Sequence, residues 1–371
     1  MFVKCQDICA AVEKWAPKQL AESWDNVGLQ VGDLQQPVAR LLVALDITSD
    51  VIRQAKQRQA EMIISHHPLI FKPLKNVCAH STIGASVMEV IKHNIAAYSA
   101  HTNLDSTTGG ISELLAEIIG ITETKILDAG YREKLVKLAV FIPAGYETAV
   151  RNAMLDAGAG WIGNYSHCSF LTKGMGTFMP EAGTTPFNGV LGKLEYAEEY
   201  RLETIIREKQ VADIVNAMLA AHPYEEVAYD LYPLVNTGEG FGLGRIGRIP
   251  EPLTVEAFLQ QVKAALGCSS MKVVGNLTQE VQTIAVCGGS GASLISKAKA
   301  AGADVYITGD IKYHEAQEAL AAGLVLIDAG HFATEHMIVS ALVQYLRNYS
   351  ANAGWKLEVY AAEETDVFNV V

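Results

Sequence analysis

A short apolar run that ends at two adjacent histidines constrains this chain more than any other stretch. The run Met62–Ser65 predicts a buried strand, and Pro68 has no N–H with which to continue it. His66 and His67 therefore follow the carboxyl end of a strand, where open α/β sheets bind their ligands. Adjacent side chains on an extended backbone point in opposite directions, so the two imidazoles suit two neighbouring metals better than one. On this stretch alone, a backbone-bonded core histidine beside a solvated one is an equally good interpretation.

Strands and helices alternate on both sides of this stretch. Apolar strands are expected at 41–45 and 95–100, with helices at 50–59 and 82–93. A second series of the same kind runs from about 255 to 360. This alternation is typical of βαβ units and predicts an α/β fold with parallel strands.

The segment between the two series has a different pattern. Strand, helix, two strands, helix and strand follow one another, beginning with a strand expected at 135–142. That order matches the ferredoxin-like βαββαβ plan. Glycine-rich 238–244 marks the return to the first pattern. We therefore expect a two-part α/β core formed by residues 1–127 and 241–371, with a ferredoxin-like α+β domain inserted at 128–240.

Composition limits the class of protein. Half of the residues are hydrophobic and 19% are charged, yet no run of about eighteen apolar residues predicts a transmembrane helix. The first residues lack the apolar stretch of a signal peptide, and the six cysteines include no Cys-x-x-Cys pair. We therefore expect a cytoplasmic protein with reduced thiols. A net charge of −12 argues against non-specific nucleic-acid binding.

Five side chains from three distant segments form the strongest candidate site. Asp105 follows strand 95–100, as His66 and His67 follow theirs, and His331 and Glu335 project from one face of a late helix. Three histidines and two carboxylates suit zinc, iron, manganese, cobalt or nickel, and five ligands are too many for one tetrahedral zinc. We expect two metals about 3.5–4 Å apart with Glu335 between them. Taken alone, His331 and Glu335 would more simply be an exposed helical pair.

Five short motifs lie in order along both ends of the chain. They are Trp24-Asp25-Asn26-Val27-Gly28-Leu29, Ser65-His66-His67-Pro68, His101-Thr102-Asn103-Leu104-Asp105, Gly309-Asp310-Ile311-Lys312-Tyr313-His314 and Asp328-Ala329-Gly330-His331-Phe332-Ala333-Thr334-Glu335. Together they resemble the GTP cyclohydrolase I type 2 homologue family, also called the NGG-interacting-factor-three-like family. The resemblance covers about 1–125 and 245–371.

The resemblance has consequences for the site and for the assembly. It implies a two-metal centre with ligands at His66, His67, Asp105, His331 and Glu335. It also implies a ring-shaped homohexamer whose metals face an inner cavity. The middle region resembles the PII/CutA-type domain that is inserted in longer members of the family.

Other polar residues near these motifs have weaker assignments. His101, four residues before Asp105, could bind metal or orient a ligand, and the sequence favours a role in orienting a ligand or contacting substrate. Lys312 and His314 either line the pocket or lie on a solvated helix face. The glycine-rich segment 287–293 follows a strand and precedes a helix, so its N–H groups could hold a phosphate, although a tight turn explains it more simply.

If the protein is an enzyme, the expected chemistry is metal-assisted hydrolysis, and the sequence singles out no catalytic residue. The family resemblance implies GTP as the small-molecule substrate, and another nucleotide or a phosphate ester fits the residues equally well. The alternative is a non-catalytic metal-binding regulatory or scaffold protein, whose inserted domain senses small molecules or builds oligomers. The ligand set accepts zinc, iron or manganese alike.

Overall fold

The computed structural model describes residues 3–369, and the chain divides into two compact units. Unit 1 comprises Met1–Tyr131 and Phe241–Val371, and unit 2 comprises Arg132–Gly240. Strands β7 (Thr122–Pro143) and β10 (Tyr229–Thr254) continue from one unit into the other. Within residues 3–369, no helix is long and apolar enough to cross a membrane.

The first sheet of unit 1 has the strand order β15-β4-β5-β6-β2. These strands are Glu358–Ala361, Arg40–Ala44, Met62–Ser65, Ala96–Ser99 and Gly28–Val31. The first four are parallel to their neighbours, and β2 is an antiparallel edge strand. Every residue of β5 and β6 is buried, as expected for parallel strands that are covered on both faces.

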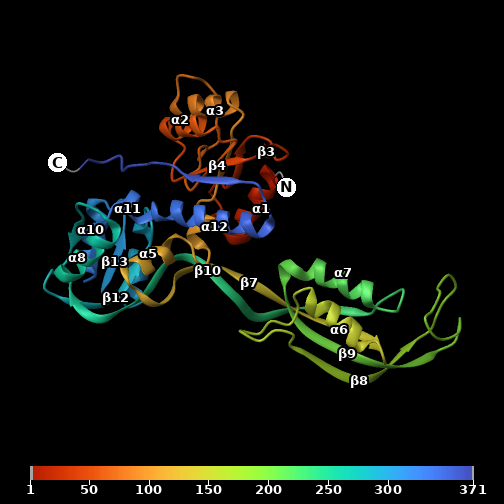
Figure 1. Cartoon of the computed structure of the whole chain (residues 1–371). Coiled ribbons are helices and arrows are strands. Elements are labelled where there is room, and N and C mark those ends of the chain that lie inside the picture. The colour runs from red at the N-terminus through yellow and green to blue at the C-terminus, as the bar shows by residue number, and fades with distance from the viewer. Residues whose placement is uncertain (1–2, 370–371) are drawn as a thin grey trace. The chain divides into compact units, whose positions relative to one another are not determined.

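Helices cover both faces of this sheet (Figure 1). On one face, α1 (Cys5–Trp15) and α12 (Met337–Ala353) share a core with alternate residues of β4. On the other face, α2 (Ser49–Arg58) and α3 (Thr82–Lys92) share a core with the intervening residues. The hydroxyl of Thr48 accepts a hydrogen bond from the N–H of Val51 and so caps α2.

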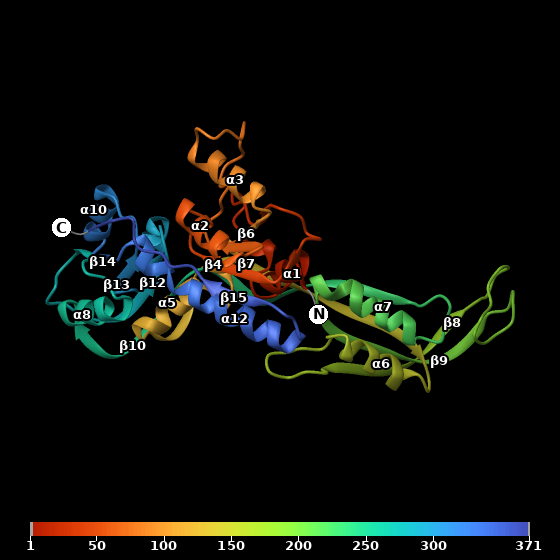
Figure 2. The same cartoon turned by 45° about the horizontal axis from the view of Figure 1, so that its top comes forward.

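The second sheet of unit 1 contains β11 (Lys272–Val274), β14 (Val325–Asp328), β13 (Val305–Thr308) and β12 (Glu280–Val286), followed by the unit 1 part of β10. The central strands β14, β13 and β12 are parallel. One face shares a core with α5 (Ile111–Ile119) and α8 (Val255–Leu266), and the other with α9 (Ile295–Ala300) and α10 (Tyr313–Ala321). Figure 2 shows α8 and α10 on the two sides of these strands.

Short elements complete unit 1. Strands β1 (Val3–Lys4) and β3 (Pro37–Val38) pair with each other. Helix α4 (Thr102–Ser106) follows β6, and helix α11 (His331–Glu335) follows β14. Both short helices therefore begin just beyond the carboxyl ends of parallel strands, which is where the predicted ligands were expected.

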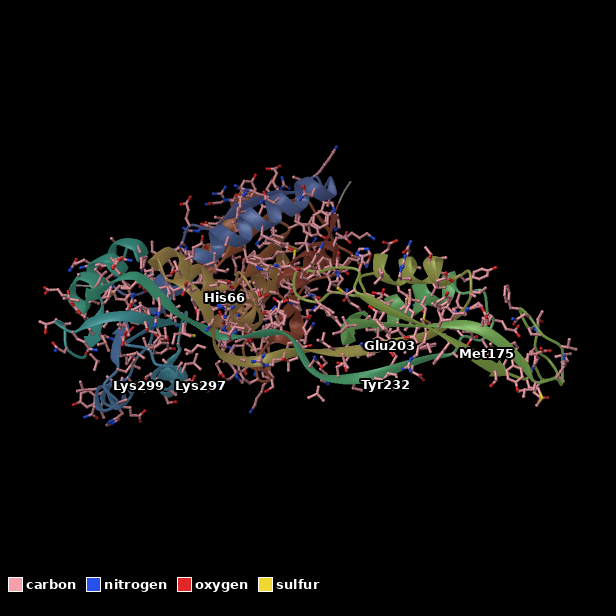
Figure 3. All side chains as sticks on the ribbon, turned by 90° about the horizontal axis from the view of Figure 1, so that it is seen from below. His66, Met175, Glu203, Tyr232, Lys297 and Lys299 are labelled. Carbon is pink, nitrogen blue, oxygen red and sulfur yellow. The ribbon has the colours of Figure 1, made fainter. Side chains whose placement is uncertain are left out.

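Unit 2 has the ferredoxin-like plan. Its elements follow the order β7, α6 (Glu147–Asp156), β8 (Ser169–Phe178), β9 (Glu195–Arg207), α7 (Val211–Ala221) and β10, and its sheet has the order β10-β7-β9-β8. Both helices share one core with β7 and β9. Met175 on β8, Glu203 on β9 and Tyr232 on β10 mark three of the strands in Figure 3. The prediction of a mixed α/β core with an inserted ferredoxin-like segment is confirmed.

One strand is much longer than its apolar pattern indicates. A strand was expected at 135–142, but β7 begins at Thr122. Its first half contains only exposed and half-buried residues, so no continuous apolar run marks it. Pairing with β10 extends the strand, because backbone hydrogen bonds between neighbours do not require buried side chains.

Candidate metal centre

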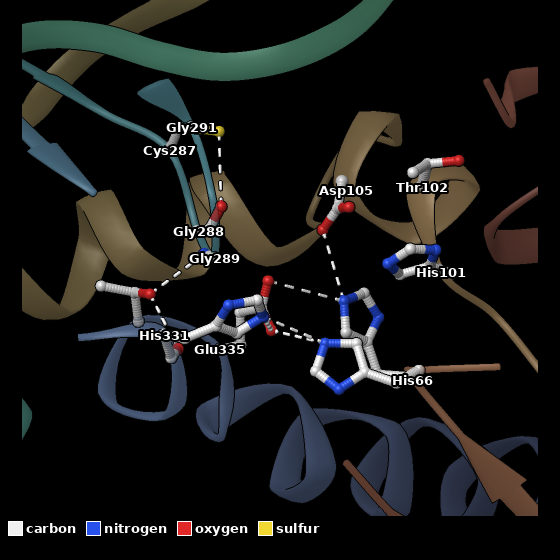
Figure 4. A network of polar contacts seen from close by, with 12 residues as sticks. His66, His101, Thr102, Asp105, Cys287, Gly288, Gly289, Gly291, His331 and Glu335 are labelled. Atoms are coloured by element: carbon white, nitrogen blue, oxygen red, sulfur yellow. Dashed lines mark hydrogen bonds and ion pairs between the residues drawn. The ribbon is translucent and has the colours of Figure 1, made fainter. Parts of the chain in front are cut away.

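The structure brings the five predicted ligands together inside unit 1. His66 and His67 follow β5, and Asp105 lies in α4 after β6, so three of the residues come from the first sheet. His331 and Glu335 are the first and last residues of α11, which follows the second sheet. Figure 4 shows Glu335 between His331 on one side and His66 on the other.

The two carboxylate oxygens of Glu335 face nitrogen atoms of different histidines. Its Oε2 lies 3.0 Å from Nε2 of His67 and 3.0 Å from Nε2 of His331. Its Oε1 lies 3.8 Å from Nε2 of His66, which is also 3.7 Å from Oδ1 of Asp105. Glu335 thus belongs to two sets of possible ligands, one with His67 and His331 and the other with His66 and Asp105. Within each set the ligand atoms lie within 4.8 Å of one another, so each set could hold a metal ion.

Two buried polar atoms test whether a metal fits this position. Nε2 of His66 and Oδ1 of Asp105 have no hydrogen-bond partner among the described residues. Leaving a buried polar atom unpaired costs about 1–3 kcal/mol. The Nδ1–H of His66 donates to the carbonyl of Ala100 at 2.9 Å, which leaves Nε2 with a free lone pair. A cation between these atoms would satisfy both, so the residues fit a metal ion.

Two further carboxylates hold the imidazoles of His67 and His331. Nδ1 of His67 donates to Asp46 at 3.0 Å, and Nδ1 of His331 donates to Asp310 at 2.7 Å. These bonds leave each Nε2 facing Glu335. Neither carboxylate was singled out from the sequence as a site residue. The available signal was that each follows a strand, Asp46 after β4 and Asp310 after β13.

We expect Asp310→Asn to weaken metal binding by about 10- to 100-fold, because the amide no longer orients and polarises His331 as a carboxylate does. The matched control is Asp304→Asn at the opposite end of β13, whose carboxylate accepts backbone hydrogen bonds from Gln282 and Thr283. Competition with a chromophoric zinc chelator measures both affinities. Equal affinities in the two variants would show that Asp310 does not support the centre.

His101 borders the centre and is held by Asp25. Its Nδ1 lies 2.9 Å from Oδ1 of Asp25, and its ring is 5.1 Å from the ring of His66. Burial raises the pKa of Asp25, but hydrogen bonds from His101 and Thr102 outweigh burial and lower it to about 2. His101 also forms a possible ligand set with His66 and His67. Its role in orienting a ligand or contacting substrate stays a prediction.

Lys312 and His314 contribute no ligand atom to this cluster. Both are exposed at the start of α10, and Nδ1 of His314 lies 3.1 Å from Oε1 of Gln317. Neither belongs to a described group of possible metal ligands. Their role in substrate binding stays a prediction.

The glycine-rich segment after β12 approaches the centre closely. Gly289 has a φ of +59°, and a Cβ on it would lie 2.0 Å from Oε1 of Glu335. Its N–H donates to the hydroxyl of Thr334, and the N–H of Gly291 donates to Thr308. Close packing against Glu335 therefore explains Gly289, and close packing against Tyr306 and Thr308 explains Gly291. The N–H groups of both glycines already have partners.

Charge interactions set the protonation of the metal-free centre. Burial lowers the pKa of His67, but hydrogen bonds to Asp46 and Glu335 outweigh it and raise that pKa to about 10. The hydrogen bond to Glu335 raises the pKa of His331 to about 9. Burial is the largest influence on the other two ligands, His66 and Asp105. It lowers the pKa of His66 and raises the pKa of Asp105.

We expect metal binding at pH 7.5 to release protons from His67 and His331. Both pKa values lie above this pH, so both rings are protonated before binding, whereas a metal-bound imidazole must be neutral. Affinity should therefore increase as the pH rises toward 9 and 10. Calorimetry with zinc in two buffers of different ionisation enthalpy measures the protons released. Release of none would contradict this charge state.

Comparison with known proteins places the chain among close relatives. A family model described as Duf34/NIF3 (NGG1p interacting factor 3) matches residues 3–367. A Halalkalibacterium halodurans protein named "GTP cyclohydrolase 1 type 2 homolog" is 43% identical over 367 residues, which are 99% of this chain and 98% of that one. A Bacillus subtilis protein of the same name is 43% identical over 335 residues, 90% of each chain.

Solved structures extend this similarity to the fold. A Bacillus cereus protein related to NIF3 matches with a TM-score of 0.95 and 42% identity, and the match covers 100% of both chains. A Staphylococcus aureus protein matches with a TM-score of 0.80 and 29% identity, covering 100% of this chain and 99% of that one.

Proposed function

The chain belongs to the Duf34/NIF3 family, and on that premise we propose that it is a metal-dependent hydrolase with a two-metal centre. The proposed ligands are His66, His67, Asp105, His331 and Glu335. The observation that supports this most is the position of Glu335, whose Oε2 faces His67 and His331 while its Oε1 faces His66. The unpaired buried atoms of His66 and Asp105 add to it.

Two divalent ions, whether zinc, iron or manganese, would supply a nucleophile at neutral pH and polarise a substrate oxygen. The residues around them have separate tasks. Asp46 and Asp310 keep two imidazoles in place, and Asp25 fixes the ring of His101 beside the centre. We propose that His101 hydrogen-bonds a substrate from this position. GTP, which the names of the relatives suggest, is one candidate substrate, and other nucleotides and phosphate esters are further candidates.

The test is turnover by the metal-loaded full chain. The protein is purified without oxygen and loaded with zinc, iron or manganese. It is then incubated with GTP, other nucleotides, phosphate diesters, and positively or negatively charged carboxylic esters and amides. We expect hydrolysis of at least one class, and its loss in His67→Ala together with lost metal. Full metal occupancy without turnover of any class would contradict the hydrolase.

The proposed setting is a cytoplasmic homohexamer. All six cysteines are free thiols, which suits a reducing compartment. One chain has a mass of 40.0 kDa, so light scattering should give about six times that mass. A monomer or dimer at physiological concentration would contradict the hexamer.

A regulatory or scaffold role is the second candidate, and the separate core of unit 2 favours it. That unit also contains a cavity of about 450 Å³, lined by Phe141, Phe187 and Tyr224 among others. Removal of residues 132–240 distinguishes the two functions. Retained metal and turnover would make the unit an accessory, whereas loss of a response to a small molecule would favour regulation.

A further inference from the structure

A cavity of about 730 Å³ in unit 1 opens onto the proposed metal centre. His67 and His331 form part of its wall, on the side where Asp46 and Asp310 hold them. Its volume lies in the range of sites that enclose a small molecule. A substrate approaching from this side would therefore meet the wall of the cavity before it meets the centre.

Carboxylates are the most frequent charged groups in the wall of this cavity, which we call the acidic cavity. Seven are present, and Lys272 is the one lysine or arginine among the described wall residues. Besides Asp46 and Asp310, the carboxylates are Asp50, Asp328, Glu363, Glu364 and Asp366. Apolar groups, among them Val51 and Phe368, cover other parts of the wall.

Backbone N–H groups hold two of these carboxylates in place, those of Glu364 and Asp328. Glu364 accepts hydrogen bonds from the backbone N–H groups of Leu45 and Asp46, at 2.7 and 3.0 Å. Asp328 accepts from the N–H of Gly330 at 3.1 Å and lies 3.3 Å from the amine of Lys272. Backbone N–H groups orient a carboxylate but leave its formal charge unchanged.

Two arginines behind the wall reduce the charge only in part. Arg53 pairs with Asp50 at 2.9 Å, and Arg58 lies 3.9 Å from Glu363. The seven wall carboxylates carry seven negative charges, and Lys272 and the two arginines carry three positive ones. The cavity and these arginines therefore have a formal charge of −4. Two divalent metals, counted with Asp105 and Glu335, would add +2. The cavity therefore stays negative when the centre is filled, and it repels polyanions.

We propose that the acidic cavity selects organic cations, such as amines with an apolar body, and disfavours polyphosphates such as GTP. This substrate class rests on the proposed hydrolase. The wall carboxylates meet the positive group of the substrate, and the apolar wall residues cover its hydrocarbon part. The centre then receives the bond to be hydrolysed.

Three hydroxamates with one metal-binding head and one three-carbon spacer test this selectivity. 4-Aminobutanehydroxamate ends in a cation, pentanehydroxamate in a methyl group, and glutarate monohydroxamate in an anion. Their affinities for the zinc-loaded full chain are measured by calorimetry at low ionic strength. We expect the cation to bind about tenfold more tightly than the anion, with the neutral compound between them. Salt should reduce this ratio, because the Debye length is about 10 Å at 0.1 M.

A triple variant separates the wall charge from the centre. Asp50→Asn, Glu363→Gln and Asp366→Asn remove three charges that contact none of the proposed metal ligands. The ratio should fall to about threefold or less, while pentanehydroxamate and zinc bind as in the wild type. The matched control neutralises three exposed carboxylates outside the cavity, Glu256, Glu280 and Glu318, and should keep the original ratio.

The outcomes distinguish this inference from the function on which it rests. If no hydroxamate binds, the centre is closed to small molecules, and the hydrolase and the substrate class both fail. If all three bind equally, or if the anion binds most tightly, the substrate class is overturned while the hydrolase stands. A ratio that the triple variant leaves unchanged also overturns it, because the wall carboxylates would then not be its cause.

Discussion

Glu335→Gln should lose both metal ions of the proposed two-metal centre while the chain stays folded. Glutamine keeps the shape of the side chain but carries no negative charge, so neither metal position retains its shared carboxylate. We expect at least a 100-fold loss of affinity, because a carboxylate ligand and the charge opposite two imidazoles disappear together. The fold persists because His67 and His331 can release their protons once Glu335 no longer stabilises them.

Metal content of protein purified without oxygen measures this effect, and thermal unfolding without metal reports the fold. The control is Glu133→Gln in unit 2, since Glu133 is also buried and paired, with Arg207 and Lys209. The control should bind as much metal as the wild type. Two ions per chain in Glu335→Gln would refute the shared carboxylate.

Gly289→Ala should also empty the centre, although alanine adds a single methyl group. The new Cβ would lie 2.0 Å from Oε1 of Glu335 and 3.2 Å from Nε2 of His331, which is closer than the carboxylate can tolerate in its present position. Glu335 must move, so at least one metal position loses its ligand. The positive φ of +59° adds a strain of about 1–2 kcal/mol for any residue with a Cβ.

The strain and the collision can be separated with a second glycine. Gly302 has a φ of +85°, and a Cβ on it would meet no described atom within 4 Å. Gly302→Ala should therefore lower the unfolding temperature through backbone strain alone. Its metal content should stay at the wild-type level. If Gly289→Ala also binds metal normally, the segment after β12 does not restrict the ligands.

The sequence predicted the general fold because each element leaves a local signal. Buried parallel strands are continuous apolar runs, and β5 is one of them. The pairing of β15 with β4 has no such signal, since Glu358 pairs with Arg40 although 318 positions separate them in the sequence. The length of β7 was equally hidden, because strand pairing extends it through residues without an apolar pattern.

The site divides in the same way. Histidines and carboxylates directly after strands identify a ligand cluster, because the carboxyl ends of neighbouring strands meet at one edge. The partners of those ligands depend on tertiary contacts, such as that of His331 with Asp310. The acidic cavity was least predictable, since Glu364 comes from an irregular segment and bonds to the backbone of Leu45 and Asp46.

The split origin of unit 1 has a consequence for its synthesis on the ribosome. Asp105 is translated 230 residues before Glu335. The interval between the synthesis of β4 and that of its partner strand β15 is longer still. At about 5–20 residues per second, the early half emerges roughly 12–46 seconds before the late ligands exist. Unit 2 can fold during this interval, whereas one apolar face of the first sheet waits for α12. Nascent chains should therefore require chaperone protection mainly while residues 132–353 are being made.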